Sequence, residues 1–139
     1  MKLDGKWIGQ YTYLEGYAES IKGKSVSFEL NLISHGIEFE GNFSDDESRE
    51  IFFENGFIKG FIENTYISFH KRYPKPWIID DNGNPLILEN EIHPEIEYQG
   101  ELIDNQFKGT WEIRRYYQGE EGIFSMVLGS GTWFMRNEI

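Results

Sequence analysis

A group of aromatic side chains with polar tips is the strongest chemical feature of this sequence. The group consists of Tyr11, Tyr98, Trp111, Tyr117 and Trp133. Rings of this kind line small-molecule cavities when they converge, because they combine apolar area with a few hydrogen-bonding groups. Arg115 belongs to the same alternating series as Trp111 and Tyr117, and its guanidinium could bind a carboxylate or phosphate. We therefore predict that these six residues bind a small, mainly apolar ligand, with Tyr11, Arg115 and Tyr117 as its polar contacts.

Two alternatives to a ligand site remain open. The rings could fill the interior of the fold, and the head of Arg115 could reach solvent and pair with a loop carboxylate. The protein would then act as a protein-interaction module without ligand or catalysis, with Trp77 and Phe57 as exposed contacts. Outward apolar residues among Phe57, Phe61 and Tyr66 favour contact between copies, so a homo-oligomer is a further expectation.

Metal and catalytic chemistry have weaker support. The chain has no cysteine, and its three histidines share no metal-ligand spacing. The spacing of a calcium-binding EF-hand loop is matched at Asp80, Asn82, Asn84 and Glu91. Pro85 stands where that loop requires glycine, so we interpret the segment as a hairpin turn. Because no Gly-x-Ser-x-Gly elbow or comparable nucleophile frame is present, we expect no metal, no cofactor and no enzymatic activity.

The charge of the chain restricts its partners. Asp and Glu number 24 against 13 Lys and Arg, a net charge of −11, which disfavours nucleic acid. The adjacent carboxylates Asp45 and Asp46 and the basic run "HKRY", His70 to Tyr73, are expected to lie in solvent. The chain shows no signal-peptide pattern and no apolar run of membrane-spanning length, so we expect a cytoplasmic protein without a membrane partner.

Alternating apolar and polar residues predict β-strands throughout the chain. Phe28, Leu30 and Leu32 share one face of such a strand, and no segment has a sustained helical period. We predict a single all-β domain over residues 1–139 with eight main strands, at 3–14, 25–34, 37–44, 56–62, 65–73, 95–103, 106–117 and 123–136. An antiparallel meander with an even number of strands and this length can remove its exposed edges by closing into a barrel.

Three tight turns fix the expected register. They are His35-Gly36, Glu63-Asn64 and Asp104-Asn105. These turns place Leu32 opposite Phe39, Gly60 opposite Ile67, Tyr98 opposite Trp111 and Glu101 opposite Lys108. Glycines inside strands, as in "FKGTWEI", are expected to allow strand curvature and close packing of large rings.

The connections divide the barrel into two unlike ends. The tight turns fall at one end, and the longer connections 15–24, 45–55, 74–94 and 118–122 fall at the other. All four prolines lie within 74–94, which we predict to be a hairpin-like insertion. The longer connections hold 13 of the 24 acids, so this open end favours neutral or cationic ligands over anions.

The two ends of the chain carry a family resemblance. Gly5-Lys6-Trp7 opens the first strand, and Arg136 lies near the end of the last. This arrangement resembles the calycin pattern, in which lipocalins begin with Gly-x-Trp and a basic residue of the final strand packs across that tryptophan. Avidin-like barrels are similar in strand number, and small acidic bacterial proteins share the "GKW" opening and "GTW" ending. The resemblance implies an eight-stranded barrel, an interior ligand and a cation–π contact of Arg136 with Trp7.

Overall fold

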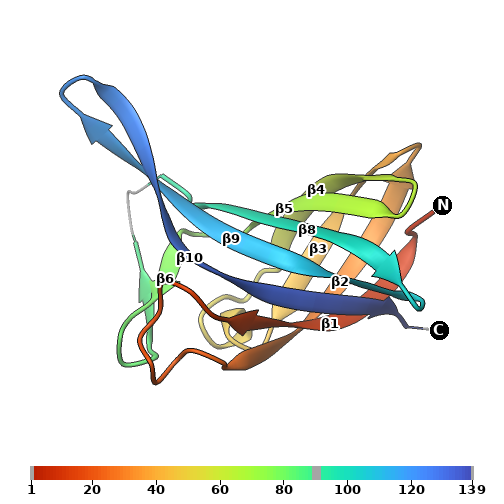
Figure 1. The fold of residues 1–139 in the computed structure, drawn as a ribbon, viewed down its shortest axis with the longest axis horizontal. Helices are drawn as coiled ribbons and strands as arrows, with labels where there is room; N and C mark the ends of the chain where they lie inside the picture. The colour runs from red at the N-terminus through yellow and green to blue at the C-terminus, as the bar shows by residue number, and fades with distance from the viewer. Residues whose placement is uncertain (1, 89–91, 139) are drawn as a thin grey trace.

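A closed antiparallel barrel forms the body of the protein in the computed structural model, which describes residues 2–88 and 92–138. The strands are β1 (Gly5–Tyr13), β2 (Ser25–His35), β3 (Glu38–Asp45), β4 (Gly56–Glu63), β5 (Tyr66–Arg72), β6 (Trp77–Ile79), β7 (Pro85–Ile87), β8 (Glu95–Ile103), β9 (Gln106–Gly119) and β10 (Gly122–Asn137), with a short 3-10 helix η1 (Ser48–Glu50). The barrel order is β1-β10-β9-β8-β5-β4-β3-β2, and β6 pairs with β7 in a separate hairpin (Figure 1). This confirms the predicted all-β, calycin-like architecture and its hairpin insertion.

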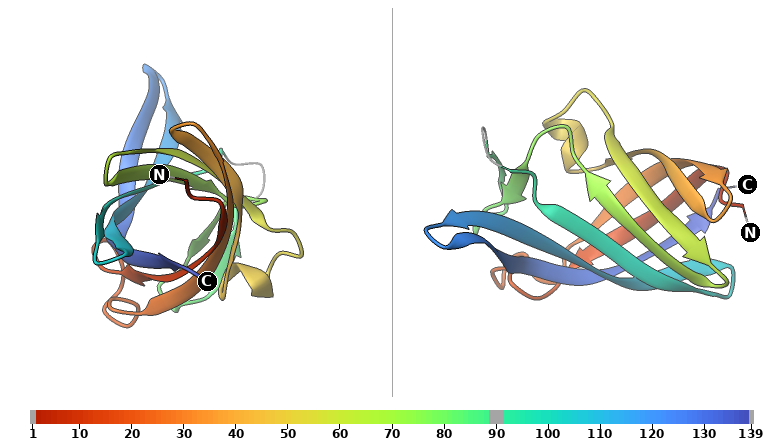
Figure 2. Two further views of the ribbon diagram at one scale, coloured as in Figure 1. Left: turned by 90° about the vertical axis from the view of Figure 1, so that its right-hand side faces the viewer. Right: turned by 90° about the horizontal axis from the view of Figure 1, so that it is seen from above.

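The two ends of the barrel differ as expected. Both termini and the three tight hairpins lie at one end, and the β6–β7 hairpin lies at the other (Figures 1 and 2). The connection expected at 118–122 is shorter than predicted, because β9 and β10 continue past the barrel as a two-stranded ribbon. This ribbon ends in a turn at Glu120-Glu121. The described residues contain no helix long and apolar enough to cross a membrane.

One of the three predicted turn registers is confirmed. The β8–β9 turn is Asp104-Asn105, with φ angles of 51° and 65°, and Tyr98 lies opposite Trp111. On the outer face Glu101 lies opposite Lys108, as predicted. Positive φ at both central residues is the requirement of a type I′ hairpin turn, which asparagine and aspartate tolerate.

The other two predicted registers are wrong by two residues. Leu32 pairs with Gly41 rather than Phe39, and Gly60 pairs with Phe69 rather than Ile67. The physical reason is backbone conformation. Gly36 (φ 67°) and Asn64 (φ 56°) take the first central turn position, so each turn begins one residue later than predicted. A shift of two residues preserves the face of every side chain, which is why the predicted inward residues are still inward.

The strand glycines allow indole rings to lie flat across neighbouring strands. The Trp111 Nε1–H donates to the carbonyl oxygens of Thr12 and Thr132, and a Cβ at Gly131 would lie 2.7 Å from that nitrogen. The Trp133 Nε1–H donates in the same way to Gln99 and Thr110, over Gly100. A side chain at either glycine would displace the indole, so these glycines have the packing role that was predicted.

The closed end of the barrel is filled by side chains. Trp7 packs against Phe107, with ring centroids 5.6 Å apart, and donates from Nε1 to the carbonyl oxygen of Leu3. Met135 is fully buried, and the next residue of β10, Arg136, is exposed on the outer face. Trp7 therefore points into the barrel while Arg136 points away from it, which differs from the cation–π contact that the resemblance implies.

Candidate ligand-binding cavity

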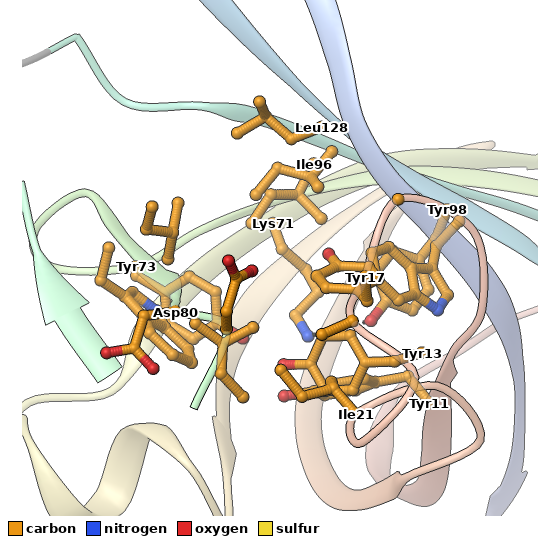
Figure 3. Close-up of a pocket in the computed structure, with 18 residues that line it drawn as sticks. Tyr11, Tyr13, Tyr17, Ile21, Lys71, Tyr73, Asp80, Ile96, Tyr98 and Leu128 are labelled. Carbon is orange, nitrogen blue, oxygen red and sulfur yellow. Dashed lines mark hydrogen bonds between the residues drawn. The ribbon is translucent and has the colours of Figure 1, made fainter. Parts of the chain in front are cut away.

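A cavity of about 200 Å³ lies in the barrel interior toward the open end. Figure 3 shows the tyrosines of its aromatic wall, Tyr11, Tyr13, Tyr17, Tyr73 and Tyr98. The indoles of Trp77 and Trp111 belong to the same wall. Apolar side chains complete the lining, among them Ile21, Ile96 and Leu128. Residues from the β1–β2 connection and from the insertion border the cavity along with the barrel strands.

Lys71 of β5 projects into this aromatic group. It continues the inward series Ile67, Phe69, Lys71 and Tyr73, and only 4% of its surface is exposed. The run "HKRY" was predicted to be solvated, which is wrong for Lys71 and Tyr73, although His70 and Arg72 are exposed. The strand period of two residues overrides the local charge run, because alternate residues point to opposite faces.

The Lys71 ammonium is surrounded by π faces. Its Nζ lies 4.7 Å from the ring centroids of Tyr11 and Phe43 and 4.9 Å from that of Tyr98. The rings of Phe28 and Tyr73 lie at 5.5 Å. Nζ also donates a hydrogen bond to the Tyr98 hydroxyl at 3.2 Å. These rings stabilise a cation and at the same time exclude water from it.

Two carboxylates lie next to this group. Asp45 is fully buried; its Oδ2 lies 4.0 Å from Lys71 Nζ and accepts a hydrogen bond from the Tyr73 hydroxyl at 2.6 Å. Its Oδ1 accepts a hydrogen bond from the backbone N–H of Ser48 at 2.6 Å. The prediction that Asp45 lies in solvent is therefore wrong, because Asp45 continues the inward series of Phe39 and Phe43 in β3.

Glu47 extends the network toward the rim. Its Oε1 accepts hydrogen bonds from the hydroxyls of Tyr11, at 3.0 Å, and Tyr13. Its Oε2 lies 3.4 Å from the Nζ of Lys24, on the solvent side. The tyrosine hydroxyls thus satisfy two carboxylates whose burial would otherwise be costly.

Burial controls the protonation of the cavity groups. It lowers the pKa of the Lys71 amine to about 8, while the charges of Asp45 and Glu47 act in the opposite direction. Burial also raises the pKa of the Tyr11, Tyr73 and Tyr98 hydroxyls well above their usual value, and the charge of Asp45 adds to the effect. The tyrosines therefore remain protonated donors, and Lys71 titrates close to neutral pH.

The Lys71 titration predicts a pH-dependent stability. Unfolded Lys71 has its ordinary pKa of 10.5, so between pH 8 and 10.5 the unfolded chain binds more protons and stability rises with pH. We therefore compare the free energy of unfolding of the unaltered protein with that of Lys71→Met. The difference between the two should shift in favour of the unaltered protein by about 2 kcal/mol from about pH 7 to about pH 9.5. The tyrosine hydroxyls oppose this rise only near and above pH 10, because their pKa values are raised on folding.

Urea titrations of both proteins across this pH range measure the effect. Subtracting the two profiles removes the contributions of groups that titrate alike in both proteins. The groups facing Lys71 are Asp45, Glu47, Tyr11, Tyr73 and Tyr98. Parallel profiles would show that Lys71 titrates as an ordinary lysine in the folded protein.

The structure brings four of the six predicted site residues together. Tyr11, Tyr98 and Trp111 line the cavity. Trp133 lies behind this wall and packs against Tyr98, with ring centroids 5.4 Å apart. Arg115 and Tyr117 instead lie on the β9–β10 ribbon, outside the cavity lining.

The two ribbon residues form a stack of their own. The guanidinium of Arg115 lies 5.1 Å from the ring centroid of Tyr117, and Tyr117 stacks on Phe124 at 5.4 Å. Phe124 and its neighbour Ile123 are exposed, by 54% and 64%. Ligand contact by Arg115 and Tyr117 stays a prediction.

Other cavity residues were missed by sequence reasoning. Tyr73 and Lys71 could have been found by continuing the alternation of Ile67 and Phe69 through β5. Asp45 likewise continues the inward series of Phe39 and Phe43 through β3. Glu47 had no such signal, because it lies in a connection, where acidic residues are commonly solvated.

Among the described residues, one group of side chains on the outer surface could hold a metal ion. Ligand atoms of His70, Glu95 and Glu97 lie within 4.8 Å of one another. Glu97 accepts a hydrogen bond from Gln99 at 2.7 Å, and Glu95 accepts one from the Tyr116 hydroxyl. These protein contacts account for both carboxylates, and we assign no ion to the cluster.

Of the aromatic residues predicted to form an interaction surface, some are exposed and one is buried. Trp77 is only 6% exposed and lines the cavity, so its predicted exposure is wrong. The insertion folds back over the open end and buries this indole against Tyr73. Phe57 and Phe61 do point outward, with exposures of 49% and 37%, and their contact with a second copy stays a prediction.

Known proteins resemble this chain in structure but not in sequence. No protein-family model matches the chain, and no curated protein matches its sequence. The crystal structure of rhizavidin is similar to this chain, with a TM-score of 0.45 and 12% sequence identity. The similarity covers 95% of this chain and 84% of that chain. A likeness at this level carries no inference about a ligand.

Proposed function

We propose that the protein binds a small, mainly apolar ligand in the cavity at the open end of the barrel. The observation that carries this proposal is the combination of an unfilled, aromatic-lined space with the Lys71 amine on its wall. Ligand cavities typically pair a large apolar surface with a few polar groups that fix orientation. On this proposal the protein is a carrier or sensor rather than an enzyme.

The size of the cavity limits the ligand. A dry protein cavity of roughly 150 Å³ can hold benzene, and this one is slightly larger, at about 200 Å³. A single ring with a short substituent, or a branched chain of similar volume, fits that space. A longer ligand would have to extend past the mouth, between the insertion and the β1–β2 connection.

Charge at the cavity further favours a neutral ligand. Asp80 and Asp81 of the insertion border the mouth, and Asp45 and Glu47 lie beside Lys71 in the interior. A free anion would meet these carboxylates on entry, whereas a neutral carbonyl or hydroxyl oxygen could accept a hydrogen bond from Lys71 or a tyrosine.

The alternative of a barrel filled by side chains holds for the closed end but not for the open end. Trp7, Phe107 and Met135 occupy the closed end. The space bordered by Tyr17, Ile96 and Leu128 at the open end is unfilled. A barrel used only as a rigid scaffold would gain stability from filling such a space.

Filling the cavity is expected to abolish binding. Ala18 borders the cavity, so the ring of Ala18→Phe should occupy it and weaken the binding of benzyl alcohol, used as a probe of matching size, by at least about tenfold. Fluorescence titration measures the affinity, because Trp77 and Trp111 line the same space. Ser20→Phe adds the same ring at an exposed position two residues away and should bind like the unaltered protein. Equal affinity in all three proteins, or no binding at all, would contradict the proposed site.

A further inference from the structure

Lys71 places a primary amine on the wall of an apolar cavity, where it can act as a nucleophile. Its side chain is almost fully enclosed, yet it borders the cavity together with Tyr98 and Ile96 (Figure 3). Lysine amines that are desolvated in this way are the ones that form imines with carbonyl compounds. We propose that Lys71 holds the ligand covalently and reversibly as an imine, and that the ligand is a small aldehyde or ketone. This inference rests on the proposed function, because it needs the ligand to enter the same cavity.

The groups around Lys71 supply what imine formation requires. The Tyr98 hydroxyl lies 3.2 Å from Nζ and can pass a proton between nitrogen and the carbonyl oxygen. Asp45 lies 4.0 Å from Nζ, close enough to stabilise the positive charge of a protonated imine. The surrounding rings exclude water, which favours the imine over its hydrolysis.

The step needs no oxidant and no metal. The Nζ lone pair of neutral Lys71 attacks the carbonyl carbon, the C–N bond forms, and the carbonyl π electrons move to oxygen. Nζ passes two protons in turn through the Tyr98 hydroxyl to that oxygen, which leaves as water while the C=N bond forms. The imine nitrogen can then take up one proton from solvent, equal to the one that Lys71 released when it became neutral. Entry of water reverses the sequence and releases the ligand, so binding remains reversible.

The protonation of Lys71 is compatible with this step. With its pKa lowered to about 8, roughly one Lys71 amine in ten is neutral at about pH 7. An ordinary lysine with a pKa of 10.5 is neutral in fewer than about one molecule in a thousand. The lowered pKa therefore increases the reactive fraction by more than about 100-fold.

A carbonyl ligand also fits the charges better than an acid does. Lys71 already has Asp45 and Glu47 as counter-ions, so a carboxylate ligand would add a further negative charge to the same buried group. An aldehyde or ketone is neutral on entry, and its protonated imine keeps the positive charge that these two residues already offset.

Reductive trapping tests the inference. The protein is incubated with limiting benzaldehyde and cyanoborohydride, and the benzyl group is located by intact mass and peptide mapping. We expect Lys71 to be labelled at least about tenfold faster than exposed lysines such as Lys59, and benzyl alcohol to slow only the Lys71 reaction. Ala18→Phe should also slow labelling of Lys71, which provides a variant that keeps the lysine and its network intact.

The outcomes separate this inference from the proposed function. If benzyl alcohol binds but Lys71 is not labelled preferentially, the proposed imine is wrong. The cavity would then be a noncovalent binding site. Absence of both binding and labelling overturns the two together. Labelling of Lys71 that benzyl alcohol and Ala18→Phe leave unchanged also overturns the inference, because the aldehyde would then reach Lys71 by a route other than the cavity.

Discussion

Asp45→Asn is expected to lower the free energy of unfolding by about 3 kcal/mol at neutral pH, since removing one partner of a buried charge pair leaves the other uncompensated. Lys71 must then either hold its charge with only Glu47 nearby to offset it or lose its proton, which costs about 1.4 kcal/mol at pH 7 for a pKa of about 8. The amide accepts hydrogen bonds through one atom only, so it cannot accept from both the Ser48 N–H and the Tyr73 hydroxyl as the carboxylate does, and the short bond from Tyr73 to a charged acceptor is lost.

The same variant has a distinctive pH dependence. The charge of Asp45 raises the pKa of Lys71, so its removal lowers that pKa further below 8. By about pH 9.5 Lys71 is neutral in both folded proteins, and the loss of stability should shrink to about 1 to 2 kcal/mol, the cost of one broken hydrogen bond.

Urea unfolding at the two pH values measures both effects, with Asp46→Asn as the matched control. Asp46 is exposed and pairs with Arg49 at 2.8 Å, a surface interaction worth less than about 1 kcal/mol. If the two variants lose equal stability at neutral pH, the buried pair of Asp45 and Lys71 does not contribute as described.

Gly109→Ala is expected to cost about 3 kcal/mol or to prevent folding. Gly109 of β9 lies opposite Gly100 of β8, and a Cβ added to it would overlap the carbonyl oxygen of Gln99 and come within 2.6 Å of Gly100 Cα. Both are backbone atoms, so the strands would have to separate, and the Trp133 indole that bonds to Gln99 would shift with them.

Gly119→Ala provides the matched control on the same strand. A Cβ at Gly119 would meet the edge of the Phe124 ring at 3.3 Å and the carbonyl oxygen of Gly122 at 3.4 Å, and neither glycine requires a positive φ. We expect this variant to lie within about 1 kcal/mol of the unaltered protein, because the smaller entropy of its unfolded chain offsets the contact. Thermal unfolding of the two variants is the measurement, and equal melting temperatures would contradict the packing role of Gly109.

Most of the fold can be predicted from two local patterns in the sequence, the alternation of apolar residues and the residues at turns. Alternation at Phe28, Leu30 and Leu32 requires only that successive side chains of a strand point to opposite faces. The turn at Asp104-Asn105 was predicted correctly because both residues tolerate positive φ. The register errors next to Gly36 and Asn64 arose because each turn begins one residue later than predicted, and the resulting shift of two residues left the inward faces unchanged.

The site is only partly a local property. Tyr11, Tyr98 and Trp111 could be predicted to face the interior, because they are large inward residues on regular strands. Lys71 lies on an equally regular strand, but its charged neighbours His70 and Arg72 made the segment look solvated. Its inward position can be read from the strand period once that period is given more weight than local charge.

The sequence by itself determined the strands, the inward faces and the open end, because each depends on residues close together in the chain. Only the tertiary structure decided that Lys71, Asp45 and Tyr98 meet beside an unfilled cavity. These residues lie on β5, β3 and β8, and barrel closure brings their side chains within hydrogen-bond and charge range. The lowered pKa of Lys71 has the same origin, since burial depends on every strand that surrounds the amine.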